Sequence, residues 1–157
     1  DSHDTMRFLT WCQGDKKKLM LAILFLFSYV GIPCTYYGTE IGMEGNGDPD
    51  SRRTFNWDES HWDKDLIAFY KQIISFRKKC KPLQYGNIQI WANNGIFYLE
   101  RDYGDEKVLT ALNNTEEGKN ILLPAGKAIE WVTTEKTEDV PMGFLKPFGG
   151  LSFYYSI

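Results

Sequence analysis

The stretch GIPCTYYG, residues 31–38, decides the expected fold of the first half of the chain. It is a short apolar run that contains a proline and ends at a glycine, which predicts one buried parallel strand. The preceding LMLAILFLF, residues 19–27, is apolar on every face and predicts a helix that must be covered all round. One parallel strand beside helices cannot form a sheet alone. We therefore expect partner strands from elsewhere and interpret the chain as part of a larger protein.

A long loop and a second helix follow this strand. Asp15 is a suitable N-cap for the first helix, which a glycine and a proline end. Residues 38–62 are rich in glycine and charge; loops of this length are functional or disordered, and the interleaved Trp and Phe favour order. Apolar side chains at helical spacing predict a second helix over 63–79, ended by Pro82.

The second half has the pattern of an all-β module. Its predicted strands are NIQIW, IFYLERDY, KVLTALNN, NILLP, AIEWVTT and LSFYYSI. Turn signals such as Asn93-Asn94-Gly95 separate them. Short strands at this spacing predict a small antiparallel β-sandwich. The expected division is an α/β unit over residues 1–84 and an all-β unit over residues 85–157.

Composition and charge restrict the function. The 157 residues carry a formal net charge of -3 and no basic tract, which argues against nucleic acid as a partner. The longest apolar stretch is about 12 residues, below the roughly 20 that span a bilayer, so no membrane association is expected. Cys12, Cys34 and Cys80 are widely spaced, and with only two histidines they predict neither a zinc site nor disulfides. We expect reduced thiols in a cytoplasmic protein without metal or cofactor.

Two motifs carry a family resemblance. SHDTMRFLT, residues 2–10, and the pattern G-x-P-x-x-Y-Y-G-x-E-x-G from Gly31 to Gly42 resemble the α-amylase family of glycoside hydrolases. The similarity is to its neopullulanase, cyclomaltodextrinase and maltogenic amylase group. It implies the C-terminal portion of a (β/α)8 TIM barrel, from the end of strand 7 to helix 8, followed by a small antiparallel β-sandwich. In such barrels the loops after the strands gather at the active site.

The resemblance implies roles for five residues. Asp4 matches a carboxylate that holds sugar hydroxyls and favours ring distortion, and His3 matches a histidine bonded to the same ring. Asp48 and Arg52 match a pair that contacts the next glucose toward the non-reducing end. Arg7, on the first motif, is assigned to substrate binding. The family's nucleophile and general acid follow barrel strands that this chain lacks, so the isolated chain is expected to hydrolyse nothing.

Each role has an alternative. Without the downstream motif, His3 and Asp4 would be a polar tail or a helix cap. Asp48 and Arg52 are also consistent with a turn that the two side chains order by pairing with each other. Arg7 is equally consistent with a scaffold ion pair.

The leading hypothesis is a fragment of a retaining glycoside hydrolase. Its substrates would be α-1,4-linked, and also α-1,6-linked, glucans such as maltodextrins, cyclodextrins or pullulan. Three alternatives stay open: a non-catalytic amylase-like scaffold, a transglycosylase or isomerase of the same family, and a stand-alone sugar-binding sandwich. Because the apolar helix and strand need cover, the isolated chain is also expected to self-associate.

Overall fold

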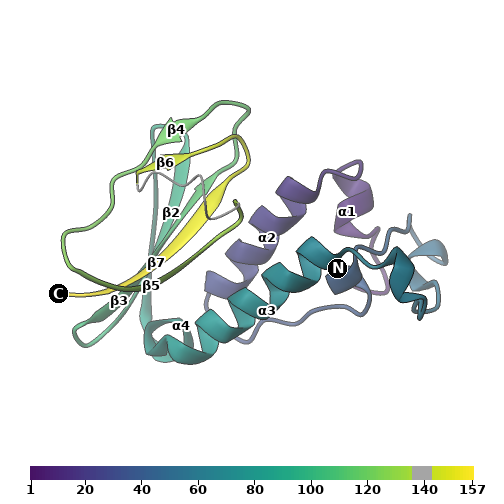
Figure 1. Ribbon diagram of the computed structural model, residues 1–157, viewed down its shortest axis with the longest axis horizontal. Helices are drawn as coiled ribbons and strands as arrows, with labels where there is room; N and C mark the ends of the chain where they lie inside the picture. Colours follow the sequence, from purple (N-terminus) through teal and green to yellow (C-terminus); the bar gives the residue numbers. More distant parts are fainter. Residues whose placement is uncertain (136–142) are drawn as a thin grey trace.

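The computed structural model describes residues 1–135 and 143–157. Helices and loops lie on one side of a β-sheet (Figure 1). The helices are α1 (Phe8–Trp11), α2 (Lys16–Ser28), α3 (Lys64–Lys79) and α4 (Lys81–Tyr85), with 3-10 turns at Thr39–Ile41, Asp50–Arg52 and Glu59–His61. The strands are β1 (Asn87–Asn93), β2 (Ile96–Tyr103), β3 (Glu106–Asn113), β4 (Lys119–Asn120), β5 (Lys127–Thr133), β6 (Phe144–Leu145) and β7 (Gly150–Ser156).

The two long helices begin where the sequence predicts. The Asp15 carboxylate accepts hydrogen bonds from the backbone N–H groups of Lys17 and Lys18 at the start of α2. Asp63 caps α3 in the same way through the N–H of Leu66. These caps satisfy N–H groups that have no partner inside the helix, which fixes where each helix starts. Both predicted helices are confirmed.

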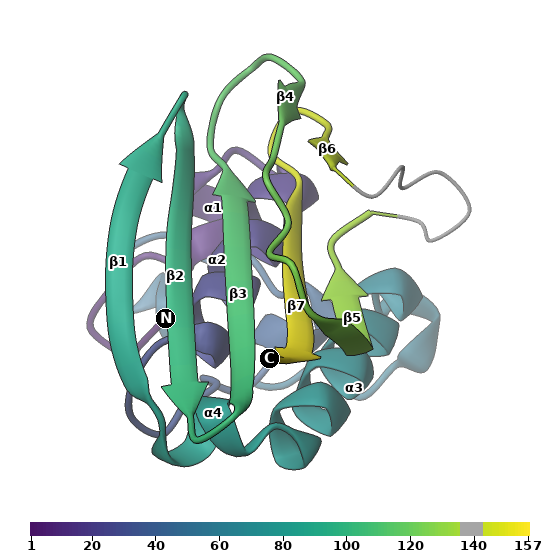
Figure 2. The ribbon, with the colours of Figure 1, turned by 90° about the vertical axis from the view of Figure 1, so that its left-hand side faces the viewer.

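Five strands form an antiparallel sheet in the order β1-β2-β3-β7-β5 (Figure 2). Asn94 and Gly95 join β1 to β2 with φ angles of 50° and 79°. Positive φ at both central residues is the requirement of a type I′ hairpin turn, so this predicted turn is confirmed. β4 and β6 pair separately as a two-stranded sheet.

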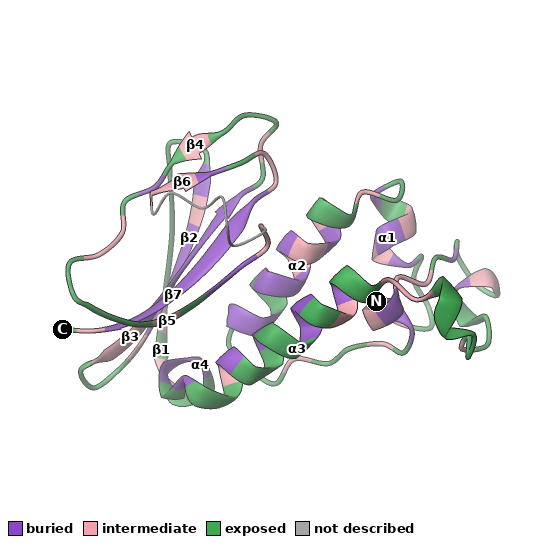
Figure 3. Ribbon diagram, viewed as in Figure 1, coloured by how far each residue is buried: buried purple, intermediate pink, exposed green. Residues whose placement is uncertain are grey.

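One face of the sheet packs against the helices. Buried side chains of α2 and α3 share a single apolar cluster with strand residues, and Figure 3 shows the buried stripes of both helices facing inward. The buried members are Leu9, Leu19, Leu21, Ile23, Leu24, Phe27, Leu66, Phe69, Tyr70, Ile73, Phe76, Cys80, Leu83, Val108, Leu112, Val132 and Tyr154. Because this cluster draws on residues from both sides of the predicted division at 84/85, that division stays a prediction.

Buried polar groups reinforce the same interface. The hydroxyl groups of Ser28 on α2 and Ser152 on β7 lie 3.1 Å apart, and that of Thr110 on β3 lies 2.7 Å from Ser152. Arg101, 1% exposed, donates to the carbonyl oxygens of Gly86, Asn87 and Ser28. Paired polar groups avoid the cost of burying unsatisfied donors and acceptors, so they fix how α2 seats on the sheet.

The opposite face of the sheet carries a second apolar cluster. Leu109, Phe153 and Tyr155 from the sheet pack there with Ile121 and Leu145, which follow or belong to β4 and β6. In Figure 2 the segment that carries β4 passes over the β7 side of this face. The sheet therefore buries apolar side chains on both faces, with helices on one and the segments of β4 and β6 on the other.

The strand predicted at 32–38 finds no partner among the described residues of this chain. This segment joins neither sheet, and Ile32 is 95% exposed. Thr39–Ile41 forms a 3-10 turn directly after it. A strand needs a hydrogen-bonded neighbour, and within the described part of the chain no strand lies beside this segment.

Smaller differences occur in the second half and before it. Of NILLP only Asn120 lies in a strand, because β4 pairs with the two residues of β6, which the sequence did not predict. Leu122 is 78% exposed, so the expected alternation fails there. Pro82 lies in the first turn of α4, where a missing N–H costs nothing, and opens a short helix that was not predicted. The remaining strands are confirmed.

Over the residues described, no helix is long and apolar enough to cross a membrane.

Candidate active site

The first residues of the chain are fixed against the long loop. The Asp1 carboxylate accepts a 2.7 Å hydrogen bond from the N–H of Phe8 and another of 2.7 Å from the hydroxyl of Thr39. The hydroxyl of Ser51 donates to the carbonyl oxygen of His3 at 3.1 Å. The contacts made by Thr39 and Ser51 join segments about forty to fifty residues apart in sequence, so the SHD motif has a defined place beside residues 39–53.

His3, Asp4, Asp48 and Arg52 come together in one group, which we call the site cluster. Arg52 Nε lies 2.7 Å from Asp48 Oδ1, and Arg52 Nη2 lies 3.5 Å from Asp4 Oδ1. His3 Nε2 is 3.1 Å from Asp4 Oδ2. The guanidinium therefore lies between the two carboxylates, and its pair with Asp48 is the one that the alternative interpretation of this loop predicts.

The side chains of the site cluster are open to solvent. Those of Asp4 and Asp48 are 68% and 55% exposed, and that of Arg52 is 47% exposed. Exposed ion pairs of this kind contribute about 0–1 kcal/mol to stability. The cluster can therefore exchange its internal pairs for the hydroxyl groups of a ligand at little cost.

Two neighbours of the site cluster were not singled out from the sequence. Ser51 is fully buried and holds the backbone of His3. The Asp50 carboxylate accepts from the N–H of Asn46 and the guanidinium of Arg53, and these bonds hold the pKa of Asp50 below its ordinary value. Ser51 and Asp50 both lie in the motif DPDSRR, which was the only sign of them in the sequence. The motif does not distinguish residues that contact a ligand from residues that hold the loop in place.

Arg7 lies beneath the surface and not among the exposed side chains. It is 0% exposed, its Nη1 donates to the carbonyl oxygen of Tyr37 at 2.8 Å, and its guanidinium lies over the rings of Tyr36 and Tyr37. The hydroxyl of Tyr37 in turn donates to the carbonyl oxygen of Arg53. This position favours a scaffold role, although the pairing is with a carbonyl and aromatic rings instead of a carboxylate.

An aromatic group lies further along the same loop. Phe55 packs on Trp57 and Trp62 with ring centroids 4.7 Å and 5.9 Å away. Trp57 is 81% exposed. Trp57 therefore packs against Phe55 and leaves most of its ring to solvent.

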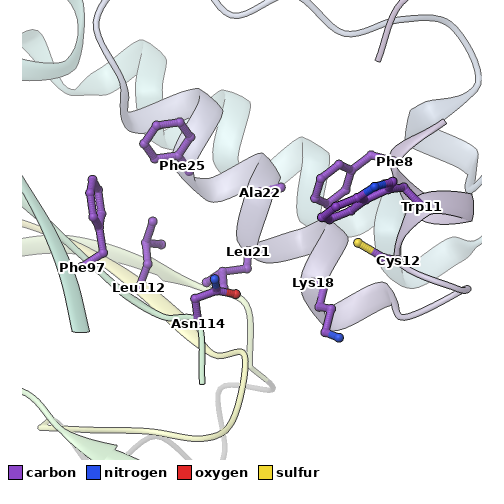
Figure 4. Close-up of a pocket in the computed structure, with 10 residues that line it drawn as sticks. All are labelled: Phe8, Trp11, Cys12, Lys18, Leu21, Ala22, Phe25, Phe97, Leu112 and Asn114. Atoms are coloured by element: carbon purple, nitrogen blue, oxygen red, sulfur yellow. The ribbon is translucent and has the colours of Figure 1, made fainter. Parts of the chain in front are cut away.

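An apolar pocket lies elsewhere in the molecule. A pocket of about 400 Å³ opens between α1, α2 and the sheet, with Phe8 and Trp11 at one end and Phe25 facing Phe97 at the other (Figure 4). Its lining includes one charged residue, Lys18, and no carboxylate. The pocket therefore lacks the groups that acid–base chemistry on a sugar needs.

The described residues contain no group of three or more His, Cys, Asp and Glu side chains placed to hold a metal ion. What the site cluster offers is two carboxylates, an imidazole and a forked guanidinium, all of which can bond to vicinal hydroxyl groups.

Comparison with known proteins identifies the family. A model described as the catalytic domain of alpha amylase matches residues 1–117. The chain therefore belongs to the α-amylase family, and the resemblance seen in the sequence is confirmed.

Several relatives within that family are named cyclomaltodextrinase, neopullulanase or maltogenic amylase. The chain is 42% identical over 130 residues to a cyclomaltodextrinase from Bacillus sp, covering 80% of this chain and 23% of that protein. It is 39% identical over 145 residues to neopullulanase 2 from Thermoactinomyces vulgaris, covering 89% and 25%. A maltogenic amylase from S. marinus has the same fold over 100% of this chain and 22% of its own, with a TM-score of 0.83 and 27% identity. The chain thus spans about a quarter of the length of these relatives.

Proposed function

We propose that this chain is one part of a longer glycoside hydrolase that acts on α-1,4-linked glucans, with α-1,6 linkages as a further substrate class. The observation that carries the proposal is the position of Arg52 between the carboxylates of Asp4 and Asp48. The relatives named as cyclomaltodextrinase and neopullulanase support maltodextrins, cyclodextrins and pullulan as substrates. One related structure is a hydrolase of cyclic α-maltosyl-(1→6)-maltose, from Arthrobacter globiformis.

The site cluster has a binding role in this proposal. Asp4 and His3 bond to the hydroxyl groups of the sugar ring at the scissile linkage, and these bonds strengthen as the ring flattens toward the oxocarbenium-like transition state. Asp48 and Arg52 hold the next ring through paired hydroxyls. A retaining mechanism needs a nucleophile and an acid about 5–5.5 Å apart, which the rest of the protein would supply.

The same proposal accounts for the unpaired segment. Residues 32–36 and the exposed side chain of Ile32 would gain cover as the eighth strand of a (β/α)8 barrel that the rest of the protein completes. Residues 1–84 would then be the end of the barrel and residues 85–157 a sandwich domain. In isolation, the uncovered apolar surface is expected to make the chain self-associate.

The second candidate is a transglycosylase. A cyclomaltodextrin glucanotransferase from Geobacillus stearothermophilus is 35% identical to this chain over 135 residues. Transfer and hydrolysis share the covalent sugar–enzyme intermediate and differ in whether water or a second sugar attacks it. A non-catalytic scaffold is the remaining alternative. The intact site cluster favours an enzyme over it.

We further propose that the protein works in the cytoplasm, with α-glucan oligosaccharides as partners and neither nucleic acid nor membrane. A relative named intracellular maltogenic amylase, from Bacillus subtilis, supports the location.

The test measures reducing sugar released from maltotriose, β-cyclodextrin and pullulan by the longer protein and by the 157-residue chain. The longer protein should hydrolyse at least one glucan and the isolated chain none. Asp4→Asn should lower kcat/KM by roughly a thousandfold, the scale of a lost transition-state contact. Matched Asp58→Asn, at an exposed carboxylate of the same loop, should change little. Full activity of the Asp4→Asn protein would contradict the assignment.

A further inference from the structure

Trp91 presents an indole ring at an edge of the sheet. Trp91 lies opposite Tyr98 in the β1–β2 register, and the two rings stack 5.3 Å apart with only 9° between their planes. Tyr98 is buried, whereas Trp91 is 40% exposed. Among the described strands β1 pairs with β2 alone and forms an edge of the sheet (Figure 2), so no described strand lies beside Trp91 on the side away from Tyr98.

Two amide side chains flank this ring on the same strand. Gln89 and Asn93 lie two residues before and after Trp91, so all three point to the same face of the sheet. Both amides are exposed. Within the described residues, no hydrogen-bond partner is found for either amide or for the indole N–H. At about 3.3 Å per residue the two amides stand roughly 13 Å apart along β1, the length of a short oligosaccharide.

The nearby charges are already neutralised. Across the ladder from Gln89, the Glu100 carboxylate lies 3.1 Å from Lys107 Nζ and accepts a 2.8 Å hydrogen bond from the hydroxyl of Tyr155. Among the described residues, the carboxylate opposite Gln89 is therefore already paired, which disfavours an ionic ligand.

A flat apolar ring between two free amides fits a pyranose. The C–H face of a sugar can lie on the indole, while each amide can both donate to and accept from its hydroxyl groups. A strand adding to the β1 edge would use the backbone instead and would leave these amides unused.

We propose that Gln89, Trp91 and Asn93 form a second glucan-binding site, which holds a neutral α-glucan chain on the sheet while the site cluster holds it elsewhere. The choice of an α-glucan as the ligand rests on the proposed function. The inference that this site binds a sugar ring rests on the geometry alone. Figure 1 places the sheet and the N-terminal segment toward opposite ends of the molecule, so the proposed site is separate from the site cluster.

The test uses the 157-residue chain with Asp4→Asn, so that it does not depend on catalysis. Maltoheptaose is added while the indole N–H signals are followed by NMR. The Trp91 signal should shift in a saturable way. Trp91→Ala should weaken binding by roughly tenfold, as for other rings stacked on aromatic side chains. The control is Trp131→Ala. Trp131 on β5 is also exposed, at 51%, but the residues two positions away from it are Ile129 and Thr133 and not amides. The Trp131→Ala variant should bind maltoheptaose as the parent does.

A second variant guards against misfolding of Trp91→Ala. Gln89→Ala with Asn93→Ala removes only exposed amides and should also weaken binding severalfold.

An unmoved Trp91 signal at the solubility limit of the sugar, or equal binding by this double variant, would overturn the proposal. Equal binding of cellohexaose would overturn the α-glucan assignment. A Trp91 signal that depends on protein concentration alone would show that a second copy covers the face. If the longer protein hydrolysed no glucan, that result would contradict the proposed function and would leave the binding measured at Trp91 unaffected.

Discussion

The site cluster and the helix–sheet interface are held together in opposite ways. Arg52, Asp4 and Asp48 are exposed by about half or more and meet through polar contacts between distant segments. At the interface, Leu24 of α2 and Ile73 of α3 are 0% exposed. Because exposed ion pairs contribute little and apolar burial contributes much, the site can change without unfolding the chain, whereas the interface cannot.

Removing apolar volume from the interface should have the largest effect. Leu24→Ala is expected to lower the free energy of unfolding by about 3–5 kcal/mol, because it leaves a cavity in a closed core. Urea denaturation followed by circular dichroism measures this. Leu26→Ala on the same helix, where Leu26 is 39% exposed, is the control and should lose about 1 kcal/mol. Equal losses would contradict the assigned core.

The buried guanidinium should come next. Arg101→Met keeps much of the side chain's length but leaves three carbonyl oxygens without their donor. We expect a loss of about 2–4 kcal/mol, since each unsatisfied buried group costs roughly 1–3 kcal/mol. The midpoint of thermal unfolding is measured for Arg101→Met and for the control variant Asp102→Asn at the neighbouring position. An unchanged midpoint for Arg101→Met would show that water replaces the donor.

Asp63 should have an intermediate, pH-dependent effect. Burial tends to raise its pKa, but its bonds from Lys16 and from the N–H of Leu66 outweigh burial and lower the pKa. A lowered folded pKa means that the stabilisation is present above the ordinary value of 3.8 and is lost as the pH falls through the folded value.

Asp63→Ala should therefore cost about 1–2 kcal/mol at pH 7, and the difference from the original chain should shrink below about pH 4. Asp63→Asn keeps a capping oxygen and should cost less. Urea titrations at several pH values measure both. A difference that grows with acid would contradict the sign.

The sequence predicted the elements whose pattern is local. α2, α3 and the hairpin turn at Asn94 follow from caps, helical spacing and turn chemistry in neighbouring residues. The predicted strand at 32–38 does not form in this chain because a strand depends on partners, and its apolar pattern says nothing of whether they are present. β6 was missed because two residues are too few for a periodic signal.

The sequence predicted which residues form the site cluster better than it predicted how they are held. The two motifs named the four residues that the fold brings together, and whether they bind sugar stays a prediction. The burial of Arg7 could not be foreseen, because it depends on Tyr36 and Tyr37 folding over the guanidinium from thirty residues away. The same holds for Ser51, whose hydroxyl holds His3.

The smallest stability effect should belong to the site cluster itself. Arg52→Lys keeps the charge but loses the fork, so the free energy of unfolding should change by less than about 1 kcal/mol. In the longer protein, KM for maltotriose should rise by roughly tenfold, because one ammonium cannot hold two hydroxyls in the same geometry. Stability and steady-state kinetics on one preparation test this. A large loss of stability would break the contrast between the two regions.

The most direct test of the central claim is a crystal structure of the longer protein with maltotriose bound. We predict hydroxyl groups of one ring within about 3 Å of Asp4 and His3, and those of the next ring within the same distance of Asp48 and Arg52. A sugar bound elsewhere, with the Arg52–Asp4 pair still closed and no hydroxyl in contact with it, would contradict the account.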